Sequence, residues 1–393
     1  MEHRQILFLS NGHGEDGIAV ALIRELGDLK DQICALPLVG LGEEYIKEGI
    51  PVLEPRMVLP SGGFTRLGPR QLWQDLRAGL LSLLRSQIRT LREMHKAISL
   101  VVCVGDVYPL LLAGLFVKRP MIFLATAKSE YINGHFPVEY WLMRKYCQKV
   151  FARDKATAEA MVNNGVAADF AGNLMMDILM QDHSVYPKKS SDPLICLLPG
   201  SRDDAYLNLG DLLDCVSIIV EERTCEFAVP LAPGLSFGEI KRTIDLQRYG
   251  PACAFEEPSP REKSQGIEGK IIVKNRVEIP VLKGCFAGLL KSCDLVIGLA
   301  GTANEQAAGL GKPVITFPGR GVQFTERFAK AQKKLLGEAV CLVAPAPRIV
   351  AEHVQIILSD PVLYNRMATV GKERMGSPGG AAVIGQYIRE ILT

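Results

Sequence analysis

Short apolar runs bounded by Gly, Pro and Asn alternate with amphipathic stretches along almost the whole chain. The runs are rich in β-branched residues and lack polar alternation, which is typical of parallel strands covered on both faces. In the first half of the chain they occupy residues 5–9, 33–38, 100–104, 121–125 and 149–152. In the second half they occupy residues 194–198, 226–231, 270–273, 295–298, 313–317 and 339–343. The alternation of such strands with helices predicts two doubly wound α/β domains.

Two irregular stretches interrupt this pattern. Residues 181–193 (QDHSVYPKKSSDP) have no apolar period and separate the two series, so we predict an interdomain linker there. Residues 247–270 contain Pro-Ser-Pro-Arg and are predicted to form a surface loop with one strand at most. Doubly wound domains bind ligands at the carboxyl ends of their strands, so the candidate functional residues are those that directly follow a strand.

Composition and charge narrow the class of protein. The chain has 393 residues, 48% of them hydrophobic and 22% charged, with a formal net charge of +2. This composition is that of a globular protein and excludes disordered, collagen-like and coiled-coil classes, and the small net charge makes nucleic acid an unexpected partner. The ten cysteines occur singly without a C-x-x-C pair, which indicates reduced thiols rather than a zinc site. We recognise no signal peptide or membrane-spanning run and expect a cytoplasmic protein.

A glycine-rich turn follows the first predicted strand. It matches G-x-G-x-x-G from Gly12 to Gly17, but the next strand ends without the carboxylate that would bind the ribose of a dinucleotide. Two interpretations therefore stay open. One is a turn that lets the following helix pack closely. The other is a helix N-terminus at which His13 faces a ligand while Glu15 and Asp16 cap the first turn.

Asp106 follows the apolar run 100–104 after a single glycine. A carboxylate at the carboxyl end of a parallel strand lies where α/β domains bind ligands. An N-cap for the helix that starts near Tyr108 is an equally good use of this residue. The sequence leaves both interpretations open.

Two turns in the second half have the chemistry of phosphate binding. Residues 198–202 (LPGSR) join a strand to a helix and offer free N–H groups beside a guanidinium. Residues 298–306 (GLAGTANEQ) join another strand to a helix through small residues, which let N–H groups approach a diphosphate. Glu305 can accept hydrogen bonds from two vicinal hydroxyls of a ribose. This second turn is the most specific local signal in the chain.

Two other patterns carry alternative functions. Ser236 lies in G-x-S-x-G, and Asp294 and His353 follow in the chain order of a hydrolase triad, although His353 falls inside a predicted helix. Residues 64–96 hold seven Lys or Arg residues and a leucine stripe at helical spacing. That pattern is typical of a helix on an anionic membrane and also of an ordinary surface helix.

Taken together, these stretches resemble the lipid-A-disaccharide synthase family, most closely the lipid-A-disaccharide synthase-related subfamily. The stretches that carry the resemblance are 10–17, 61–64, 105–106, 170–173 with 176–177, 198–202, 301–306 with 311–313, and 323–325 with 331–332. The resemblance implies a GT-B-like fold, with two doubly wound Rossmann-like domains facing a central cleft. The acceptor-binding domain would be residues 1–180 plus 378–393, with the C-terminal helix crossing back, and the donor-binding domain would be residues 190–377.

The same resemblance implies an inverting hexosyltransferase of lipid biosynthesis, peripheral on the inner face of the membrane. It would move GlcNAc or an acylated glucosamine from a UDP-sugar to a lipid or lipid-linked acceptor, with Asp106 and His13 as candidate catalytic residues. The chain has no D-x-D motif, so we expect no metal and no cofactor beyond the UDP-sugar. The implied donor-binding residues are Gly200, Ser201, Arg202, Ala300, Gly301, Thr302, Ala303, Asn304, Glu305 and Gln323. The implied acceptor-binding residues are Asn11, Gly12, Gly14, Glu15 and Asp16. A UDP-sugar 2-epimerase and a non-catalytic UDP-sugar-binding protein on the same fold stay open as alternatives.

Overall fold

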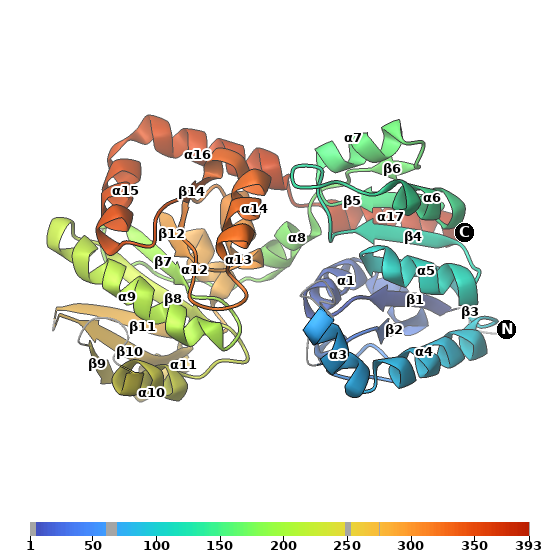
Figure 1. The fold of residues 1–393 in the computed structure, drawn as a ribbon, viewed down its shortest axis with the longest axis horizontal. Helices are drawn as coiled ribbons and strands as arrows, with labels where there is room; N and C mark the ends of the chain where they lie inside the picture. The colour runs from blue at the N-terminus through green and yellow to red at the C-terminus, as the bar shows by residue number, and fades with distance from the viewer. Residues whose placement is uncertain (1–4, 60–68, 248–252, 275, 393) are drawn as a thin grey trace. The chain divides into compact units, whose positions relative to one another are not determined.

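The structure is a computed structural model that describes residues 5–59, 69–247, 253–274 and 276–392 (Figure 1). The chain divides into two compact units. Unit 1 is Met1–Ile178 together with Pro378–Thr393, and unit 2 is Leu179–Ser377. Among the described residues, no helix is both long enough and apolar enough to cross a membrane.

Unit 1 is built on a six-stranded sheet in the order β2-β1-β3-β4-β5-β6, in which all neighbours pair in parallel. Its strands are β1 (Gln5–Ser10), β2 (Ile33–Pro37), β3 (Ile98–Gly105), β4 (Met121–Ala125), β5 (Lys149–Ala152) and β6 (Ala168–Asp169). Its helices are α1 (His13–Glu25), η1 (Gly27–Gln32), α2 (Glu43–Lys47), α3 (Pro69–Arg77), α4 (Leu80–Met94), α5 (Val107–Phe116), α6 (Pro137–Tyr146), α7 (Lys155–Asn163) and α17 (Gly380–Leu392). Helix α8 (Leu174–Gln181) lies at the boundary of the two units.

The side chains of these strands form two separate cores, one on each face of the sheet. In β1, Leu7 and Leu9 join the core formed with α5 and α6, whereas Ile6 and Phe8 join the core formed with α1 and α17. Successive residues of a strand point to opposite faces, so a run that is apolar at every position needs cover on both sides. This requirement explains why the strands of unit 1 are continuous apolar runs.

The last helix of the chain, α17, completes unit 1. It packs on α1, and its residues Ile384 and Ile388 are fully buried in the core there. The carboxylate of Asp177 accepts hydrogen bonds from the backbone N–H groups of Gly379 at 2.5 Å and Ala381 at 2.8 Å. These bonds satisfy donors that the start of α17 would otherwise leave unpaired.

Unit 2 is built on an eight-stranded sheet in the order β14-β13-β12-β7-β8-β11-β10-β9. Its strands are β7 (Leu194–Leu198), β8 (Glu226–Leu231), β9 (Cys253–Glu256), β10 (Ile267–Val273), β11 (Val277–Lys283), β12 (Leu295–Gly298), β13 (Val314–Thr316) and β14 (Val340–Leu342). Its helices are α9 (Asp204–Glu222), α10 (Phe237–Gln247), α11 (Pro260–Ser264), α12 (Phe286–Ser292), α13 (Thr302–Gly309), α14 (Glu326–Leu336), η3 (Gly337–Ala339), α15 (Pro347–Ser359) and α16 (Pro361–Met375). The strands from β14 to β11 pair in parallel, whereas β10 pairs antiparallel with both β11 and β9.

These elements confirm the predicted fold class of two doubly wound α/β domains, with two local differences. The stretch 247–270 holds β9, α11 and the start of β10, where the sequence predicts one strand at most. The sequence pattern misses these strands because the residues of β9 and β10 alternate in burial and do not form the continuous apolar run of a covered strand. The stretch 181–193 is held against unit 2, where the Ser184 hydroxyl accepts a hydrogen bond from the Gly288 N–H at 3.0 Å. A Cβ at Gly288 would lie 2.7 Å from the Ser184 carbonyl, so the segment packs tightly on α12.

Candidate functional site

In each sheet the chain crosses from one side of its first strand to the other. In unit 1 the chain runs from β1 outward to β2 and then places β3 on the other side of β1. In unit 2 it runs from β7 outward to β8 and later places β12 on the other side of β7. The connections that leave two such strands diverge, which opens a crevice at their carboxyl ends where α/β proteins bind ligands. The predicted site residues follow the strands on either side of these two points.

Asn11 and Asp106 meet at this point in unit 1. The Asp106 N–H donates to Asn11 Oδ1 at 3.3 Å, and the Asn11 N–H donates to the Val104 carbonyl at 3.3 Å. Gly105 has a φ of 128°, and a Cβ there would lie 2.3 Å from Asn11 Oδ1, so glycine permits this approach. Asp106 Oδ1 accepts from the Tyr108 N–H at 2.8 Å. Asp106 therefore caps α5 with one carboxylate oxygen while it lies at the crevice.

Asp16 lies in the core of unit 1 and not at its crevice. It is 1% exposed, and its Oδ1 accepts a hydrogen bond of 2.5 Å from the Ser10 hydroxyl, which in turn accepts one of 2.8 Å from the Tyr45 hydroxyl. Burial raises the pKa of Asp16 to about 7; the Ser10 bond lowers it, and the charges of Glu15 and Glu44 raise it. The acceptor contact expected of Asp16 does not fit this burial, because a ligand cannot reach the side chain.

Glu15 is half-buried beside this network. Burial raises its pKa, a hydrogen bond with its own backbone lowers it, and the charge of Asp106 raises it again. A carboxylate that is partly buried and near a second carboxylate holds its proton more firmly than one in water. Gly12 is the buried N-cap of α1 and Gly14 is exposed. His13 is the first residue of α1, and its side chain lies outside the described residues.

In unit 2 the turn between β12 and α13 is held from behind by buried neutral side chains. Asn304 is 0% exposed, and its Nδ2 donates to the Gly298 carbonyl at 3.0 Å and to Gln332 Oε1 at 2.9 Å. The Thr316 hydroxyl donates to the same carbonyl of Gly298 at 2.6 Å. Gln332 Nε2 donates to the carbonyls of residues 300 and 301, at 3.1 and 3.0 Å. Asn304 therefore supports the turn, and its burial does not fit the predicted direct donor contact.

The start of α13 has no side-chain cap. Its N-cap is Gly301, which has no side chain with which to accept a hydrogen bond from the first turn. Unpaired N–H groups and the positive end of the helix dipole together form an anion-binding site. Thr302 is exposed here, and Ala303 and Glu305 are half-buried in the same turn. The geometry is suited to a phosphate group, with a carboxylate one turn away.

The turn after β7 lies beside the turn after β12. Gly200 has a φ of 116°, and a Cβ there would lie 3.4 Å from the Leu299 carbonyl. Residues 201 and 202 are exposed. Gln323 lies in a third loop, where its N–H donates to Asp204 Oδ2 at 3.1 Å. The structure thus gathers the predicted donor-binding residues of three loops at one edge of the unit 2 sheet.

The residues of the alternative hydrolase triad are engaged separately. Ser236 Oγ accepts from the Glu239 N–H at 3.2 Å, and Asp294 pairs with a lysine at 2.8 Å. His353 Nδ1 lies 2.8 Å from the Ile349 carbonyl of its own helix. The hydrolase interpretation has no support in the described part of the chain.

Ser10, Tyr45 and Thr316 are not predicted from the sequence, although all three support the turns after β1 and β12. Ser10 and Thr316 are hydroxyl residues at the last position of an otherwise apolar strand, and this is the signal that identifies such residues. Tyr45 has no comparable signal, because only the fold brings it to Ser10.

Two doubly wound domains, each with candidate site residues at its switch point, define a two-domain GT-B-like fold. No protein-family model and no curated protein matches this sequence. In contrast, solved structures match the fold along nearly its whole length. S. aureus MnaA in complex with UDP has a TM-score of 0.61 and 14% identity, covering 99% of this chain and 97% of that chain. The UDP-GlcNAc 2-epimerase from Neisseria meningitidis, bound to UDP-GlcNAc, has a TM-score of 0.58 and 16% identity, and the match covers 98% of this chain and 100% of that chain. The UDP-GlcNAc 2-epimerase from Methanocaldococcus jannaschii has a TM-score of 0.58 and 14% identity, and the match covers 98% of this chain and 99% of that chain.

These matches correct the predicted family and activity. The N. meningitidis and M. jannaschii structures are UDP-GlcNAc 2-epimerases and not lipid-A-disaccharide synthases, so the resemblance to that family is wrong, as is the inverting hexosyltransferase that it implied. The lipid or lipid-linked acceptor loses its support with them. The physical reason is that glycine turns and an open helix start are requirements of diphosphate binding in this fold, and enzymes with different reactions share them.

Proposed function

We propose that this protein binds a UDP-sugar and holds its diphosphate in unit 2, at the start of α13. The observation that carries this proposal is the uncapped helix start, behind which Asn304, Gln332 and Thr316 hold the carbonyls of the turn. The backbone N–H groups of residues 302 and 303 lie at this helix start, where the helix dipole favours phosphate oxygens, and the hydrogen bonds from the core hold the turn in place. The S. aureus and N. meningitidis structures contain UDP and UDP-GlcNAc, which supports uridine diphosphate as the nucleotide.

Other predicted donor-binding residues fit this role. Glu305 would accept hydrogen bonds from the ribose hydroxyls, because it is half-buried one turn from the helix start. Arg202, on the exposed turn after β7, would place positive charge near the phosphates.

We further propose that the reaction is inversion at C2 of the sugar, as in a UDP-sugar 2-epimerase. A base takes the proton from C2 while the C–H electron pair forms a double bond to C1 and the bond from C1 to UDP breaks. In the return step UDP adds to C1 again and an acid delivers a proton to the opposite face of C2, so the reaction needs a base and an acid. Asp106 and Glu15 in unit 1 would fill these roles, since the charge of Asp106 favours the protonated form of Glu15. His13 stays a predicted third participant.

The membrane contact and the cytoplasmic location stay predictions. Part of the stretch 64–96 lies outside the described residues. In α3 and α4, Trp73, Leu76 and Leu81 are exposed, and Arg77 stacks on Trp73 with 4.1 Å between guanidinium carbon and ring centre. Exposed apolar side chains beside cations support an interfacial helix pair.

The test of the reaction is hydrogen exchange at C2 without any acceptor. Incubation with UDP-GlcNAc in D₂O should place deuterium at C2 and produce a second UDP-sugar, both measured by NMR. Asp106→Asn should slow this exchange by about 100- to 10,000-fold, the usual contribution of a general acid or base. The variant should fold, because Asn also caps helices.

The matched control is Glu159→Gln on the exposed face of α7, which should exchange at the wild-type rate. UDP binding, measured by calorimetry, should be equal in Asp106→Asn and wild type. UDP binding without deuterium at C2 would contradict the epimerase and leave the nucleotide site standing. Absence of UDP binding would contradict both.

A further inference from the structure

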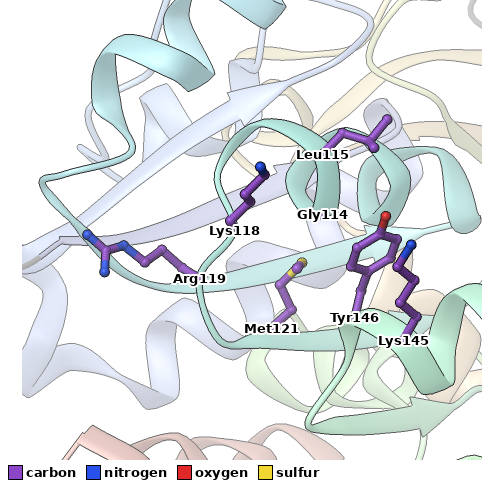
Figure 2. A pocket seen from close by; sticks show the side chains of 7 residues that line it. All are labelled: Gly114, Leu115, Lys118, Arg119, Met121, Lys145 and Tyr146. Atoms are coloured by element: carbon purple, nitrogen blue, oxygen red, sulfur yellow. The ribbon is translucent and has the colours of Figure 1, made fainter.

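Unit 1 has a pocket at the edge of its sheet opposite to the candidate site. It has a volume of about 470 Å³ and is lined by the end of α5, the turn 118–119, the first residue of β4 and the end of α6 (Figure 2). Met121 starts β4, whereas Asp106 follows the end of the parallel neighbouring strand β3. The pocket is therefore separate from the crevice at which we place the chemistry.

Three cationic side chains line this pocket: Lys118, Arg119 and Lys145. Among the described residues, none of them forms an ion pair with a carboxylate; the Arg119 Nε–H donates to the His95 carbonyl at 3.0 Å, and the Lys145 Nζ lies 4.6 Å from the ring centre of Trp141. In Figure 2, Lys118 lies between Arg119 on one side and Lys145 on the other, and the Arg119 side chain points away from the other labelled side chains.

Stabilisation of helix ends does not account for all of this charge. Helices α5 and α6 both end at the pocket, and each C-terminus carries about half a negative charge that a nearby cation offsets. Two helix ends therefore balance about one of the three cations. Arg119 is engaged by the His95 carbonyl at the end of a third helix, α4, so the pocket keeps an excess of about one positive charge, which suits a phosphate group.

Lys118 occupies a backbone conformation that favours glycine. Its φ is 55°, and its N–H closes the end of α5 by donating to the Ala113 carbonyl at 3.0 Å. Helices commonly end with glycine at this left-handed position, and a residue with a side chain is strained there. Strained residues of this kind concentrate at ligand sites. Here the strained residue is a lysine, and its side chain lines the pocket.

The opposite wall is fixed by a close contact between α6 and α5. A Cβ at Gly114 would lie 2.7 Å from ring atoms of Tyr146, so the ring packs directly on the backbone of α5. The Lys145 Nζ lies 5.1 Å from the centre of the same ring. Leu115, which is 45% exposed, and the buried Met121 add apolar surface. The pocket thus combines a cationic side with an apolar and aromatic side.

We propose that this pocket is a second ligand site, which binds a phosphate group attached to a compact or partly apolar body. Lys118 and Lys145 contact the phosphate oxygens, and Tyr146 with Leu115 contacts the attached group. The phosphate can belong to a soluble compound or to the head group of an anionic lipid, and the chemistry of recognition is the same for both.

The test uses the full chain saturated with UDP, so that the candidate nucleotide site is filled, and sodium pyrophosphate as the probe. Calorimetry should detect one further saturable site. Lys118→Gly should weaken it about tenfold, the size of one charge-assisted hydrogen bond, and Lys118→Gly with Lys145→Gln should abolish it. Because glycine relieves the left-handed backbone, Lys118→Gly should unfold at the same or a higher temperature than wild type.

The control is Lys30→Gln, an exposed lysine between α1 and β2 at the same edge of the sheet, which should bind as wild type does. A Trp73→Phe background leaves Trp141 as the only tryptophan, and its fluorescence should change on binding because it lies beside Lys145.

A second arm separates the two sources of phosphate. Sedimentation with phosphatidylglycerol vesicles but not with phosphatidylcholine vesicles, lost in the double variant, identifies a lipid head group. Pyrophosphate binding without such sedimentation identifies a soluble ligand. Binding that is absent in both arms, or that the double variant retains, overturns the proposal.

Discussion

The switch points of the two units are built from different chemical groups. In unit 2 the turn is held by amides and a hydroxyl, on Asn304, Gln332 and Thr316, all of them buried and none able to titrate near neutral pH. In unit 1 the corresponding turn is held around the carboxyl group of Asp16, whose pKa is about 7 because it is buried. The geometry of the unit 2 turn is therefore independent of pH, whereas the charge of unit 1 changes in the physiological range.

This difference matches the roles that we propose for the two units. Binding a nucleotide diphosphate needs a fixed set of N–H donors, which neutral hydrogen bonds preserve. Moving protons at a sugar carbon needs a base and an acid, which we place in unit 1 on Asp106 and Glu15, beside the buried Asp16. The following predictions test whether stability depends on pH through Asp16 in unit 1, and whether the support of the unit 2 turn is independent of pH.

The largest expected effect is the pH dependence of stability through Asp16. Its pKa is about 7 in the folded protein against 3.8 for an ordinary Asp, so the folded state binds this proton more tightly than the unfolded chain. Because of this tighter proton binding, protonated Asp16 stabilises the folded state fully below about pH 4, and the stabilisation is lost as the pH rises through 7. The free energy of unfolding should fall by about 4 kcal/mol over that range, at 1.36 kcal/mol per pKa unit.

Asp16→Asn should remove this slope, because Asn keeps the acceptor for the Ser10 hydroxyl and does not titrate. Urea unfolding followed by tryptophan fluorescence measures the slope in the right unit, since Trp73 and Trp141 both lie in unit 1. Glu159→Gln serves as the control with the same change of charge. An unchanged slope in Asp16→Asn would assign the titration to another group.

The next effect concerns the support of the unit 2 turn. Asn304→Ala leaves Gln332 Oε1 without its donor and the Gly298 carbonyl with one donor fewer, both in the core. The expected loss of stability is about 2–4 kcal/mol, from two buried hydrogen bonds at about 1–2 kcal/mol each. Hydrogen exchange of peptides that cover β12 and α13 measures it, and it should be equal at pH 5 and pH 8.

The exposed amide Gln355 on α15 provides the control, and Gln355→Ala should change exchange in the same peptides very little. UDP affinity should fall in Asn304→Ala, because the N–H groups of the turn are no longer held in place. Full UDP affinity in this variant would mean that the turn binds no phosphate.

The smallest expected effect is the ribose contact of Glu305. Glu305→Ala should weaken UDP binding by about tenfold or more, because it removes the hydrogen bonds from both ribose hydroxyls. It should also remove the preference for UDP over 2′-deoxy-UDP, which isolates the hydroxyl contact from the phosphates. Calorimetry with both nucleotides makes this comparison, and Glu352→Ala on the exposed face of α15 is its control. A preference that survives in Glu305→Ala would place the ribose elsewhere.

The two neighbours Glu15 and Asp16 illustrate the limit of the sequence. Both are acidic residues in the first turn of the same helix, and the sequence analysis treats them alike. In the structure Asp16 is 1% exposed and bound to Ser10, whereas Glu15 is half-buried and interacts with Asp106. The helix rotates successive side chains by about 100°, so one turns toward the core and the other does not. Only the packing of α1 decides which of them is buried.

The sequence by itself determined the two doubly wound domains, because strands covered on both faces must be continuous apolar runs and the turns after them must carry the polar chemistry. It also located the loops at both switch points, since small residues and carboxylates at strand ends follow from local geometry. Only the tertiary structure decided that Asn304 and Gln332 together support the turn after β12, and that Tyr45 reaches Ser10. Those outcomes depend on contacts between residues far apart in the chain, and no local pattern encodes them. The sequence pattern likewise does not distinguish related enzymes of one fold, because a turn suited to a diphosphate is common to all of them.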